Sequence, residues 1–548
     1  MPESDPLSAY AGRWVAVIRD QVAGVGASAA EALAAAQLAR PQEQPAVRFV
    51  PEPFAPALPE TVAAVTRAVP DPSRVWLVGG PVRDLLLGRR PHDLDFAVDG
   101  DGLAAARSAA NALSAAFYPL DAERGVGRVI VSTAGGPLTL DFARLRGPDI
   151  YADLAGRDFT FNALAVPLAE PETVLDPLRG AADLRARLVR QCSPSAITDD
   201  PLRAVRAVRL AAQLPGRLDP ATRAALRTAS LAAVSAERQR DEFIRCLGGP
   251  HAATAVRVLE MTGLLAQLAP ELSALKGLEQ SPPHTLDVWE HTLAVLTRLA
   301  EIITVLGRVH DVDAASDLIL GLVSVRLGRY RSQISDHLAE AVSGERPARW
   351  LLMLAALLHD AAKPATRSVD PDGRIRFFGH ETRGAALAAD LLTRLRFSAD
   401  EVKRARLIVA HHMRPRQLTQ AGEPGARAIY RFFKDTGPAG VEVVLLALAD
   451  YLAKFGGSPP PPDEWDHLVA GCAMLLEAYY ERREERVLPP ALITGDEVMA
   501  ALGLKPGPEV GRLLEAVREA QAAGEVHDAA EALAYARRQL AEPNDAPA

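Results

Sequence analysis

The sequence predicts an α+β protein in which a small α/β unit precedes a long all-helical region. A short apolar strand, Val75–Val78, runs directly into a glycine pair, and His92–Asp99 alternates apolar and polar residues as a strand does. After Pro177, apolar residues recur at spacings of three and four to the C-terminus. A chain of 548 residues is longer than one hydrophobic core usually holds, so we expect several domains.

The N-terminal segment predicts a helical extension followed by a linker. Alanine is abundant up to about Arg40, which is typical of one or two helices. Pro41–Pro59 is rich in proline and is expected to connect this extension to the next domain. Residues 1–60 are therefore assigned to an N-terminal helical extension and a proline-rich linker, with no function indicated.

The α/β unit is predicted to alternate strands with helices. One helix has proline in its first turn, a position where the missing N–H removes no helical hydrogen bond. The other assignments rest on period-two alternation for strands and apolar spacing for helices. The predicted strands are Val75–Val78, His92–Asp99, Arg128–Val131, Leu138–Arg144 and one further strand within Phe161–Leu168, and the predicted helices are Pro81–Leu87 and Leu103–Phe117.

Composition limits the class of protein. Hydrophobic residues make up 49% and charged residues 24% of the chain, as in ordinary globular domains. The three cysteines, Cys192, Cys246 and Cys472, are widely spaced, so we expect no disulfide framework and a reducing, cytoplasmic compartment. No signal peptide and no apolar run long enough to span a bilayer is evident, so no membrane is expected as a partner.

The charge distribution leaves a nucleic-acid partner open. A net charge of −8 argues against a surface coated with basic residues, but only the local field at a groove matters for binding nucleic acid. Arginine far outnumbers lysine, and many arginines lie between Arg128 and Arg257. The planar guanidinium suits phosphate and base recognition, although a GC-rich genome would produce the same overall bias.

A glycine pair follows the first strand of the α/β unit, in Gly79–Asp84 (GGPVRD). At a strand-to-helix turn, glycines let backbone amides approach a phosphate closely, and the start of the helix adds positive potential. Many turns of this kind carry glycine for geometry alone. The pair therefore indicates a phosphate site only together with its neighbours.

Three aspartates predict a two-metal site. Asp93 and Asp95 point to the same face of their strand, with Cα atoms about 6.6 Å apart. Parallel carboxylates repel unless cations lie between them, and Mg²⁺ prefers oxygen ligands and bridges triphosphate oxygens. Asp141, on the next alternating strand, is expected as the third carboxylate. The alternative is a solvent-facing strand end, which the nearby glycine turn and the third aspartate disfavour.

A predicted helix further along the chain carries polar residues at a spacing of three: Asp200, Arg203, Arg206 and Arg209. Each steps back by roughly 60° around the axis, so the four form one polar arc. A carboxylate accepts from an exocyclic amine and a guanidinium donates to ring nitrogen and carbonyl oxygen. Such a pair can select C and A over U and G without a template, whereas the alternative is a solvated face with internal ion pairs.

These features occur in the order found in one known family. Leu77–Gly88 (LVGGPVRDLLLG), followed by Asp93-Leu94-Asp95, resembles the opening motif of class II tRNA nucleotidyltransferases and bacterial poly(A) polymerases, whose head is of the polymerase-β type. Further matches follow: Arg157–Ala165 (RDFTFNALA) resembles the ribose motif, Asp176–Leu184 (DPLRGAADL) the head-to-neck turn, Asp199–Arg209 (DDPLRAVRAVR) the base-reading motif, and Glu237-Arg238 with Glu242 the neck motif. The resemblance implies an enzyme, a tRNA nucleotidyltransferase that uses CTP and possibly ATP.

The resemblance also implies roles for the site residues. Asp93 and Asp95 would hold two Mg²⁺ ions, one activating the 3′-hydroxyl and one binding the pyrophosphate leaving group, while Asp141 would polarise that hydroxyl. The implied nucleotide-binding residues are Gly79, Gly80, Arg83 and Arg157 at triphosphate or ribose, Asp200 and Arg203 at the base, and Arg206 and Arg209 at phosphate or the pocket wall.

One departure from the family pattern bears on the product. In full CCA-adding relatives a flexible loop separates the third-carboxylate strand from the ribose motif, but here only residues 145–156 lie between Arg144 and Arg157. An arginine usual before the ribose motif is replaced by Gly156. This shortened arrangement resembles CC-adding members, so we expect CC addition, with a separate A-adding enzyme acting next. Full CCA addition and poly(A) addition are the alternatives.

Five histidines in the helical region form a second pattern. Imidazole and carboxylate ligands together suit a divalent transition metal, and an adjacent His-Asp pair delivers two ligands to one cavity. The pattern resembles an HD-type phosphohydrolase domain, which implies ligands at His291, His359, Asp360 and Asp450, with His380, His411 and His412 at a second metal or a phosphate. In relatives such a domain is either a phosphatase or phosphodiesterase, or a degenerate scaffold.

The resemblance implies four domains after the extension: a head at 61–180, a helical neck and RNA-binding domain at 181–280, an HD domain at 281–456 and a helical tail at 457–548. The last boundary lies at Gly456-Gly457-Ser458 and the four prolines that follow. In the tail, residues 492–496 and 504–511 resemble the C-terminal segment of HD-bearing members. They predict either a phosphate-backbone contact or a helix-capping turn.

Two other classes of function are the alternatives to nucleotide transfer. One is a metal-dependent phosphohydrolase whose head only binds nucleotide, and the other is a non-catalytic RNA-binding protein. The paired aspartates and the base-reading motif disfavour both, because neither class needs them.

Overall fold

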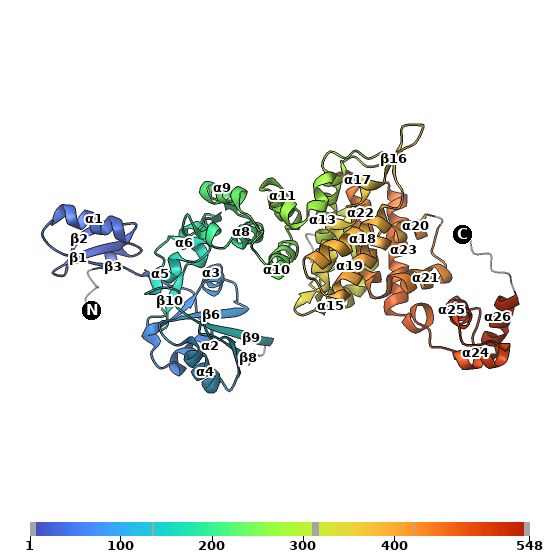
Figure 1. The fold of residues 1–548 in the computed structure, drawn as a ribbon, viewed down its shortest axis with the longest axis horizontal. Coiled ribbons are helices and arrows are strands. Elements are labelled where there is room, and N and C mark those ends of the chain that lie inside the picture. The colour runs from blue at the N-terminus through green and yellow to red at the C-terminus, as the bar shows by residue number, and fades with distance from the viewer. Residues whose placement is uncertain (1–6, 134–135, 310–316, 421, 542–548) are drawn as a thin grey trace. The chain divides into compact units, whose positions relative to one another are not determined.

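The computed structural model describes residues 7–133, 136–309, 317–420 and 422–541 (Figure 1). The chain divides into two compact units, residues 1–231 and 232–548. The first unit holds a three-stranded and a six-stranded sheet, and the second is almost entirely helical. The predicted α+β class is therefore confirmed.

The N-terminal segment is a small sheet with one helix, so the prediction of one or two helices up to Arg40 is wrong for most of it. The strands β1 (Trp14–Ile18), β2 (Gln21–Gly26) and β3 (Ala46–Phe49) pair in the order β2-β1-β3, and α1 (Ala29–Ala39) packs on them. Arg19 and Asp20 have φ of 49° and 61° and close the β1–β2 hairpin. We call β1, β2, α1 and β3 the N-terminal module; Figure 1 draws it in blue.

Residues 41–59 are not the expected linker. β3 belongs to the sheet of the N-terminal module, and β4 (Glu52–Pro53) pairs with β11 (Thr173–Val174) of the head. The N–H of Phe54 donates to the carbonyl of Glu172 at 2.7 Å. Proline is compatible with β4 because this two-stranded ribbon leaves edge positions where no N–H is needed.

The head sheet has the order β10-β5-β6-β9-β8-β7, in which β6 and β9 are parallel and the other neighbours antiparallel. Its strands are β5 (Val75–Val78), β6 (Asp93–Val98), β7 (Ala116–Asp121), β8 (Val126–Thr133), β9 (Gly136–Arg144) and β10 (Ala165–Pro167).

Two details of the head differ from the prediction. The helix expected over Leu103–Phe117 is α4 (Gly102–Leu113), which ends at Ser114 in the left-handed conformation. The chain after it enters the sheet as β7, so this edge strand was missed. The strand expected within Phe161–Leu168 starts with a 3₁₀ turn, η3 (Thr160–Asn162), and only β10 joins the sheet.

Helices cover both faces of the head sheet. On one face, α2 (Glu60–Ala68) and α4 pack over a core that includes Phe96 and Phe142, whose ring centroids are 4.7 Å apart. On the other face, α5 (Ile150–Ala155) packs with Val78 and Ala97. α3 (Gly80–Leu86) starts at the glycine turn. The rest of the unit comprises α6 (Gly180–Arg185), α7 (Ala196–Asp199), α8 (Leu202–Gln213), α9 (Pro220–Thr228) and the short parallel pair β12 (Leu188–Val189) and β13 (Arg217–Leu218).

The second unit begins with the helices α10 (Ala236–Leu247), α11 (Ala252–Met261) and α12 (Leu264–Leu268). The helices that follow are α13 (Val288–Val305), α14 (Leu318–Leu327), α15 (Arg331–Ala339), α16 (Ala348–Leu358), α17 (Lys363–Thr366), α18 (His380–Arg394), α19 (Ala399–His411), α20 (Arg414–Thr419), α21 (Ala426–Thr436), α22 (Gly440–Ala453) and α23 (Pro462–Tyr480). The region was expected to be helical throughout, but it also holds the hairpins β14 (Ala341–Ser343) with β15 (Arg346–Pro347) and β16 (Arg367–Val369) with β17 (Ile375–Phe377).

One helical stretch, Ala426–Ala453, is long and apolar enough to cross a membrane, contrary to the expectation that no such run exists. It comprises α21 and α22, joined through Gly437–Ala439. In its most apolar window 83% of the residues are buried inside the structure, and the core helix of a soluble domain passes the same test. The stretch is therefore weak evidence for a membrane span.

The last helices, α24 (Gly495–Leu502), α25 (Pro508–Ala522) and α26 (Ala529–Ala541), form a core of their own that starts at Ile493. α23, which was expected in the tail, instead packs on α14, α20 and α22. Thr494 caps α24: its side chain accepts from the N–H of Glu497, and the Glu497 carboxylate accepts from the N–H of Thr494. Residues 492–496 thus contain a helix cap, one of the two interpretations of this segment.

Candidate functional site

The turn between β5 and α3 places the glycine pair beside a carboxylate. Gly79 has φ 78° and ψ −135°, a conformation that residues with a Cβ rarely adopt. A Cβ on Gly79 would lie 3.0 Å from Nη1 of Arg157 and 3.8 Å from Oδ2 of Asp95. Glycine therefore provides both the backbone conformation and the close approach, and it brings three of the predicted site residues together.

Asp93, Asp95 and Asp141 stand on the sheet face that α5 covers. Asp95 lies directly opposite Asp141 in the parallel register of β6 and β9, and Asp93 is exposed at the start of β6. Burial raises the pKa of Asp95 to about 6, and the negative charge of Asp141 adds to the rise. The ionised form of Asp95 is thus disfavoured by burial and by its neighbour, and a divalent cation between the two carboxylates would stabilise it.

The three aspartates are spread more widely than a closed cation site. In the part of the chain that the structure describes, three potential ligand atoms lie within 4.8 Å of one another only in the second unit. Asp141 is held by Arg128, which lies opposite it on β8 and donates Nε and Nη2 to its two oxygens at 2.8 Å each. This bidentate contact neutralises Asp141 and fixes the direction of its carboxylate.

A chain of hydrogen bonds connects the glycine turn to α8. Nη1 of Arg83 donates to Oδ1 of Asn162 at 2.8 Å, and Nδ2 of Asn162 donates to Oδ1 of Asp158 at 3.1 Å. Nη1 of Arg206 donates to the other oxygen of Asp158 at 3.2 Å. Burial alone would raise the pKa of Asp158, but Arg206 and Asn162 hold it below its usual value. An ionised Asp158 therefore links Arg83, predicted to bind phosphate, to Arg206 on the helix predicted to contact the base.

Arg157, which follows α5, is held by Asp153 within that helix. Its Nε and Nη2 donate to Oδ2 of Asp153 at 3.0 and 2.9 Å. Asp153 is buried and also accepts from the N–H of Arg146 at 3.1 Å. These contacts direct the remaining nitrogen of Arg157, Nη1, toward Gly79.

Three members of the predicted polar arc, Arg203, Arg206 and Arg209, lie on α8, but the first of them is bound to backbone and Asp200 is outside the helix, in extended conformation. Arg203, Arg206 and Arg209 are half-buried, and the residues between them are buried. Nη1 of Arg203 donates to the carbonyls of Arg157 and Ala196, and its Nη2 donates to the carbonyl of Gly156. Arg203 thus fixes the start of the ribose motif against α8. Asp200 precedes the arc and accepts from the N–H of Leu202 at 3.3 Å.

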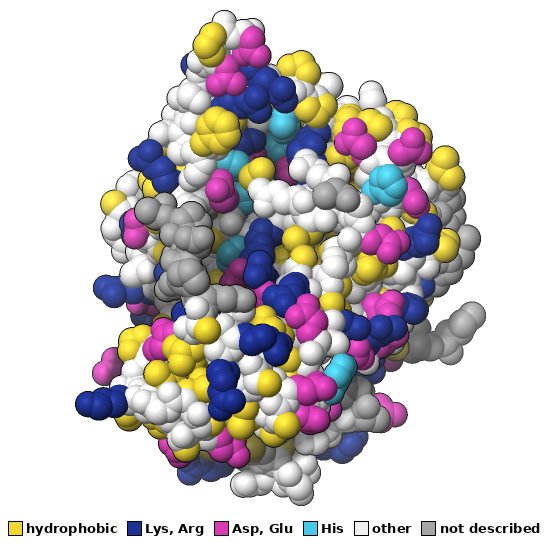
Figure 2. Space-filling view, turned by 90° about the vertical axis from the view of Figure 1, so that its right-hand side faces the viewer, with side chains coloured by type: hydrophobic (Ala, Val, Ile, Leu, Met, Phe, Trp, Pro, Cys, Tyr) yellow, Lys and Arg dark blue, Asp and Glu magenta, His cyan; other side chains and the backbone are white. Residues whose placement is uncertain are grey.

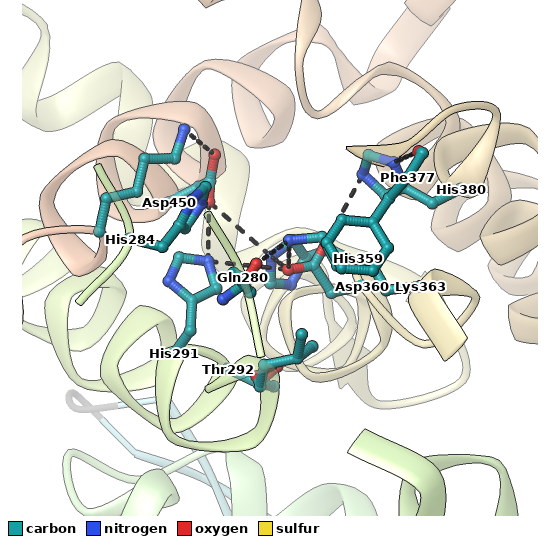
Figure 3. Close-up of polar contacts among 12 residues, drawn as sticks. Gln280, His284, His291, Thr292, His359, Asp360, Lys363, Phe377, His380 and Asp450 are labelled. Atoms are coloured by element: carbon teal, nitrogen blue, oxygen red, sulfur yellow. Dashed lines mark hydrogen bonds and ion pairs between the residues drawn. The ribbon is translucent and has the colours of Figure 1, made fainter. Parts of the chain in front are cut away.

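The four ligands predicted for the second site meet inside the second unit (Figure 3). His291 comes from α13, His359 and Asp360 follow α16, and Asp450 comes from α22. Nε2 of His291 lies 3.0 Å from Oδ1 of Asp450 and 3.7 Å from Oδ2 of Asp360, and Nε2 of His359 lies 3.1 Å from the same Asp360 oxygen. All four side chains are buried.

Backbone carbonyls orient three imidazoles of this site. Nδ1 of His359, His380 and His412 each lies 2.7 Å from the carbonyl oxygen of the residue three positions earlier. A carbonyl oxygen only accepts, so Nδ1 carries the proton and Nε2 is left to bind a cation. Burial lowers the pKa of His412 to about 3, which keeps its imidazole in the neutral form that metals bind.

Two buried polar atoms at the centre of this site fit a cation. Nε2 of His359 and Oδ2 of Asp360 are buried and lie 3.1 Å apart, and among the described residues neither makes a hydrogen bond of good geometry, although Nζ of Lys363 lies 2.8 Å from Oδ2. Burial alone would raise the pKa of Asp360, but His359 and Lys363 hold it well below its usual value. Although burial lowers the pKa of His359, the charge of Asp360 raises it above its usual value. A proton or a metal ion at Nε2 therefore completes the pair.

A second set of ligand atoms shares Asp360. The described residues contain two groups whose ligand atoms lie within 4.8 Å of one another: His291, His359 and Asp360, and Asp360, His380 and His412. His380 and His412 thus join the centre as predicted. His411 belongs to neither group, so only its alternative role, at a phosphate, stays a prediction. It is one residue before His412 on the same helical stretch, and neighbouring residues point about 100° apart.

The second site opens into a pocket of about 260 Å³. Lys363 donates to Gln280 at 2.6 Å and lies 2.8 Å from Oδ2 of Asp360, while Lys454 lies 3.1 Å from Asp450. Further basic and aromatic lining residues are Arg374, Arg376, Phe377, Phe378 and Arg416. Figure 2 shows histidine side chains in the hollow of one face of the molecule, with Lys and Arg side chains beside them. The pocket therefore offers positive charge next to the ligand set.

Three family models match the chain. They are the poly A polymerase head domain at residues 75–190, the probable RNA and SrmB-binding site of polymerase A at 217–276, and the HD domain at 284–454. The chain is also 37% identical over 477 residues to the A-adding tRNA nucleotidyltransferase of Deinococcus radiodurans, which covers 86% of this chain and 96% of that relative. The chain belongs to the tRNA nucleotidyltransferase family.

Other relatives of this tRNA nucleotidyltransferase carry different names. The CC-adding tRNA nucleotidyltransferase of Thermus thermophilus is 37% identical over 472 residues, covering 85% of this chain and 93% of the relative. The multifunctional CCA protein of Pseudomonas paraeruginosa is 31% identical over 62% of this chain and 74% of the relative. The A-adding and CC-adding relatives are equally identical to this chain, so identity does not separate the two activities.

The fold is that of known CCA-adding enzymes. An apo form matches with a TM-score of 0.55 and 18% identity, over 89% of this chain and 96% of that structure. A CCA-adding enzyme with CTP matches with a TM-score of 0.55 and 19% identity, over 89% and 97%. At these identities the likeness concerns the fold alone.

Several residues of the tRNA nucleotidyltransferase sites were not selected from the sequence pattern. Arg128, Asp158, Asn162 and Asp153 hold the predicted residues in the head, and Lys363, Lys454 and Gln280 do so in the HD domain. Three of them carry a local signal, because Asp153 lies four residues from Arg157, Lys363 three from Asp360 and Lys454 four from Asp450. Arg128 reaches Asp141 through the antiparallel register of the neighbouring strands β8 and β9, whereas Gln280 reaches Lys363 only through tertiary folding.

Proposed function

We propose that this tRNA nucleotidyltransferase transfers CMP from CTP to the 3′ end of tRNA and stops after the second C. The observation that carries the proposal is the segment between β9 and Arg157. This segment, residues 145–156, is short and contains α5, whose Asp153 binds the Arg157 side chain. A pocket wall held in this way cannot rearrange to accept ATP after CTP, so the final A is left to a separate enzyme. We place this activity in the cytoplasm, where tRNA is processed.

Residues of the head supply the binding and orientation for this reaction. Asp93 and Asp95 would hold Mg²⁺, which when bound stabilises the negative charge of the reacting triphosphate. Asp141, oriented by Arg128, lies opposite Asp95 on the neighbouring strand and polarises the tRNA 3′-hydroxyl. Transfer then forms the bond from that oxygen to the α-phosphate of CTP and releases pyrophosphate.

Other side chains position the nucleotide. Arg157 and Arg83 flank the glycine turn and bind triphosphate or ribose oxygens. Asp200, just before α8, faces the base together with Arg206 and Arg209 of that helix, and Arg203 fixes the helix against the ribose motif. Asp158 couples the two groups because it accepts from both Asn162 and Arg206.

The nucleotide question is settled by primer extension. A tRNA lacking its 3′ end is incubated with Mg²⁺ and CTP, ATP or both, and a tRNA ending in CC is incubated with ATP. We expect two nucleotides from CTP alone and no extension of the CC-ended tRNA. Robust ATP incorporation after the second C would overturn CC-only addition. Extension of the CC-ended tRNA alone would identify an A-adding enzyme, and addition of CC followed by A would identify a CCA-adding enzyme. Long tracts of A would identify a poly(A) polymerase.

A second activity, metal-dependent phosphate-ester hydrolysis, is favoured by the HD domain. Two overlapping ligand groups share Asp360, and a basic pocket adjoins them. A transition metal held by these residues would supply a Lewis acid for the phosphate ester. Lys363, which contacts Asp360 and lines the pocket, is placed to bind the phosphate.

This activity is tested with p-nitrophenyl phosphate and with a short RNA carrying a 3′-phosphate, in Mn²⁺, Ni²⁺, Co²⁺ or Mg²⁺. We expect hydrolysis by the full chain and its loss in the His359→Ala, Asp360→Ala double variant. His411→Ala is the matched control, because His411 is outside both ligand groups. A purified wild-type chain that is inert with every metal would mean that the HD domain is only a scaffold.

A further inference from the structure

We infer that the N-terminal module positions Arg157 for nucleotide binding by holding α5 in place. The family model of the head begins at residue 75, so the module lies outside it. The inference rests on the proposed role of Arg157 at the nucleotide. It gives a role to the N-terminal segment, for which the sequence pattern indicates none.

The module contacts α5 through three aromatic rings. The ring centroids of Trp14 in β1 and Tyr151 in α5 are 4.9 Å apart, and that of Phe49 in β3 lies 5.6 Å from Trp14 and 6.2 Å from Tyr151. Phe49 is buried, and Trp14 and Tyr151 are half-buried. Aromatic pairs at these distances stabilise a contact beyond the area that they bury.

The same contact is continuous with the core of the head. Phe49 and Trp14 pack in one cluster with Leu154 of α5 and with Val78 and Ala97 of the sheet. Ala97 follows Asp95 by two residues, so this cluster lies on the sheet face that carries the aspartates. The module and α5 therefore cover the face of the sheet on which the site is built.

The module is also fastened to the head away from α5. The chain leaves β3, forms β4 beside β11, and continues with the hydrogen bond from Phe54 to Glu172. The module is thus held on two sides, by the aromatic contact and by this ribbon. A body held at two places can resist movement of α5, whereas a tethered domain could not.

On its other side α5 carries the residue that holds Arg157. Tyr151 and Asp153 are two residues apart and so point about 200° apart on the short helix. Tyr151 faces the module, and Asp153 binds both Nε and Nη2 of Arg157. Alone, α5 has six residues, too few to be stable without packing. Loss of the aromatic contact would therefore loosen Asp153 and release Arg157.

A double-mutant cycle on the full chain tests this coupling. Steady-state CMP transfer is measured for Trp14→Ala, Asp153→Asn and the double variant, with the KM for CTP and the kcat determined separately. We expect each single variant to raise the KM for CTP by at least about threefold with a smaller change in kcat, and the double variant to be no worse than Asp153→Asn alone. Trp14→Phe should restore most of the loss.

Two further variants keep the result interpretable. Tyr151→Ala removes the same contact from the side of the head and leaves the core of the module intact, so it should match Trp14→Ala. Leu38→Ala changes an exposed side chain on α1 of the module and should leave the KM unchanged. Circular dichroism at the assay temperature establishes that each variant is folded.

The outcomes separate this inference from the function on which it rests. If Arg157→Ala leaves the KM for CTP unchanged, the proposed role of Arg157 fails. If Arg157→Ala raises the KM but Trp14→Ala and Tyr151→Ala do not, the positioning role of the module is overturned. Additive effects of Trp14→Ala and Asp153→Asn overturn it too, because they show that the module acts by another route.

Discussion

At the scale of single residues, the predicted site residues are oriented by neighbouring groups to which no role in the reaction was assigned. Arg128 orients Asp141, Asp153 orients Arg157, and three backbone carbonyls fix the imidazoles of the HD domain. Each of these contacts satisfies a buried or half-buried polar group that would otherwise be costly to keep away from water. The direction of a site residue is therefore set by a second residue, and small changes at either should alter binding before they alter folding.

The glycine turn is one such position. In Gly79→Ala the new Cβ would lie 3.0 Å from Nη1 of Arg157, at a φ of +78°. We expect a backbone strain of about 1–3 kcal/mol and a displaced Arg157, and hence a KM for CTP raised by about tenfold or more. Gly88→Ala is the matched control, since Gly88 also has a positive φ but no atom within 4 Å of its Cβ position. Equal kinetic losses in the two variants would contradict the proposed contact.

In the HD domain, two adjacent histidines should behave differently. His412 belongs to a ligand group and His411 does not. In a full chain carrying Asp95→Ala, which removes a transferase metal ligand, isothermal titration with Mn²⁺ or Ni²⁺ should show a loss of affinity of at least about tenfold for His412→Ala. His411→Ala should bind as its parent does. Equal affinities for all three chains would remove His412 from the metal site.

At the scale of elements, buried strands with a clear alternation of apolar and polar residues were predicted well, whereas exposed or alanine-flanked strands were missed. β5 matches its predicted bounds and β6 differs by one residue at each end, because a buried alternating strand leaves a clear period-two pattern. β7 is an edge strand with mostly exposed residues, so its pattern is weak. β1 was hidden by the alanine content of the segment, although Trp14–Ile18 is rich in residues that favour strands.

The helix cap at Thr494 distinguishes the two interpretations of the tail. Thr494→Ala should destabilise the C-terminal helices by about 1 kcal/mol, and Thr494→Asp should not, because aspartate caps equally well. Thermal unfolding monitored by circular dichroism checks this. If the segment only caps α24, neither variant should change tRNA affinity in a filter-binding assay. A weaker affinity in Thr494→Asp alone would instead indicate contact with RNA phosphates, which the added negative charge repels.

At the scale of the whole molecule, two compact units hold two separate sets of ligands. The paired aspartates lie in residues 1–231 and the histidine centre in residues 232–548. Each site is built on elements of its own unit, since the head site uses the six-stranded sheet and the HD site uses α13, α16 and α22. Changes that remove one chemistry should therefore spare the other.

This separation can be measured directly. Asp95→Ala should abolish CMP transfer while leaving tRNA binding and phosphate-ester hydrolysis within about twofold of the wild type, because sites that share no residues usually act independently. Asp99→Ala removes the same charge from the end of the same segment, where it pairs with Arg74 in solvent, and should leave transfer unchanged. Transfer that survives Asp95→Ala would place the metal ligands elsewhere.

The sequence by itself determined the chemistry of this protein. The order of motifs from Gly79 to Arg209 indicated nucleotide transfer through its resemblance to a known family, and the His-Asp pattern indicated a metal-binding domain in the same way. Only the pairing of Asp93 with Asp95 followed from spacing alone, because a strand places alternate residues on one face. The tertiary structure alone decided which of these side chains meet and what holds them. It left His411 out of both ligand groups, paired Arg128 with Asp141, turned Arg203 toward backbone carbonyls, and placed the N-terminal module against α5. The contacts of Trp14 with Tyr151 and of Arg203 with the carbonyl of Arg157 join residues far apart in the chain, and no local spacing encodes them.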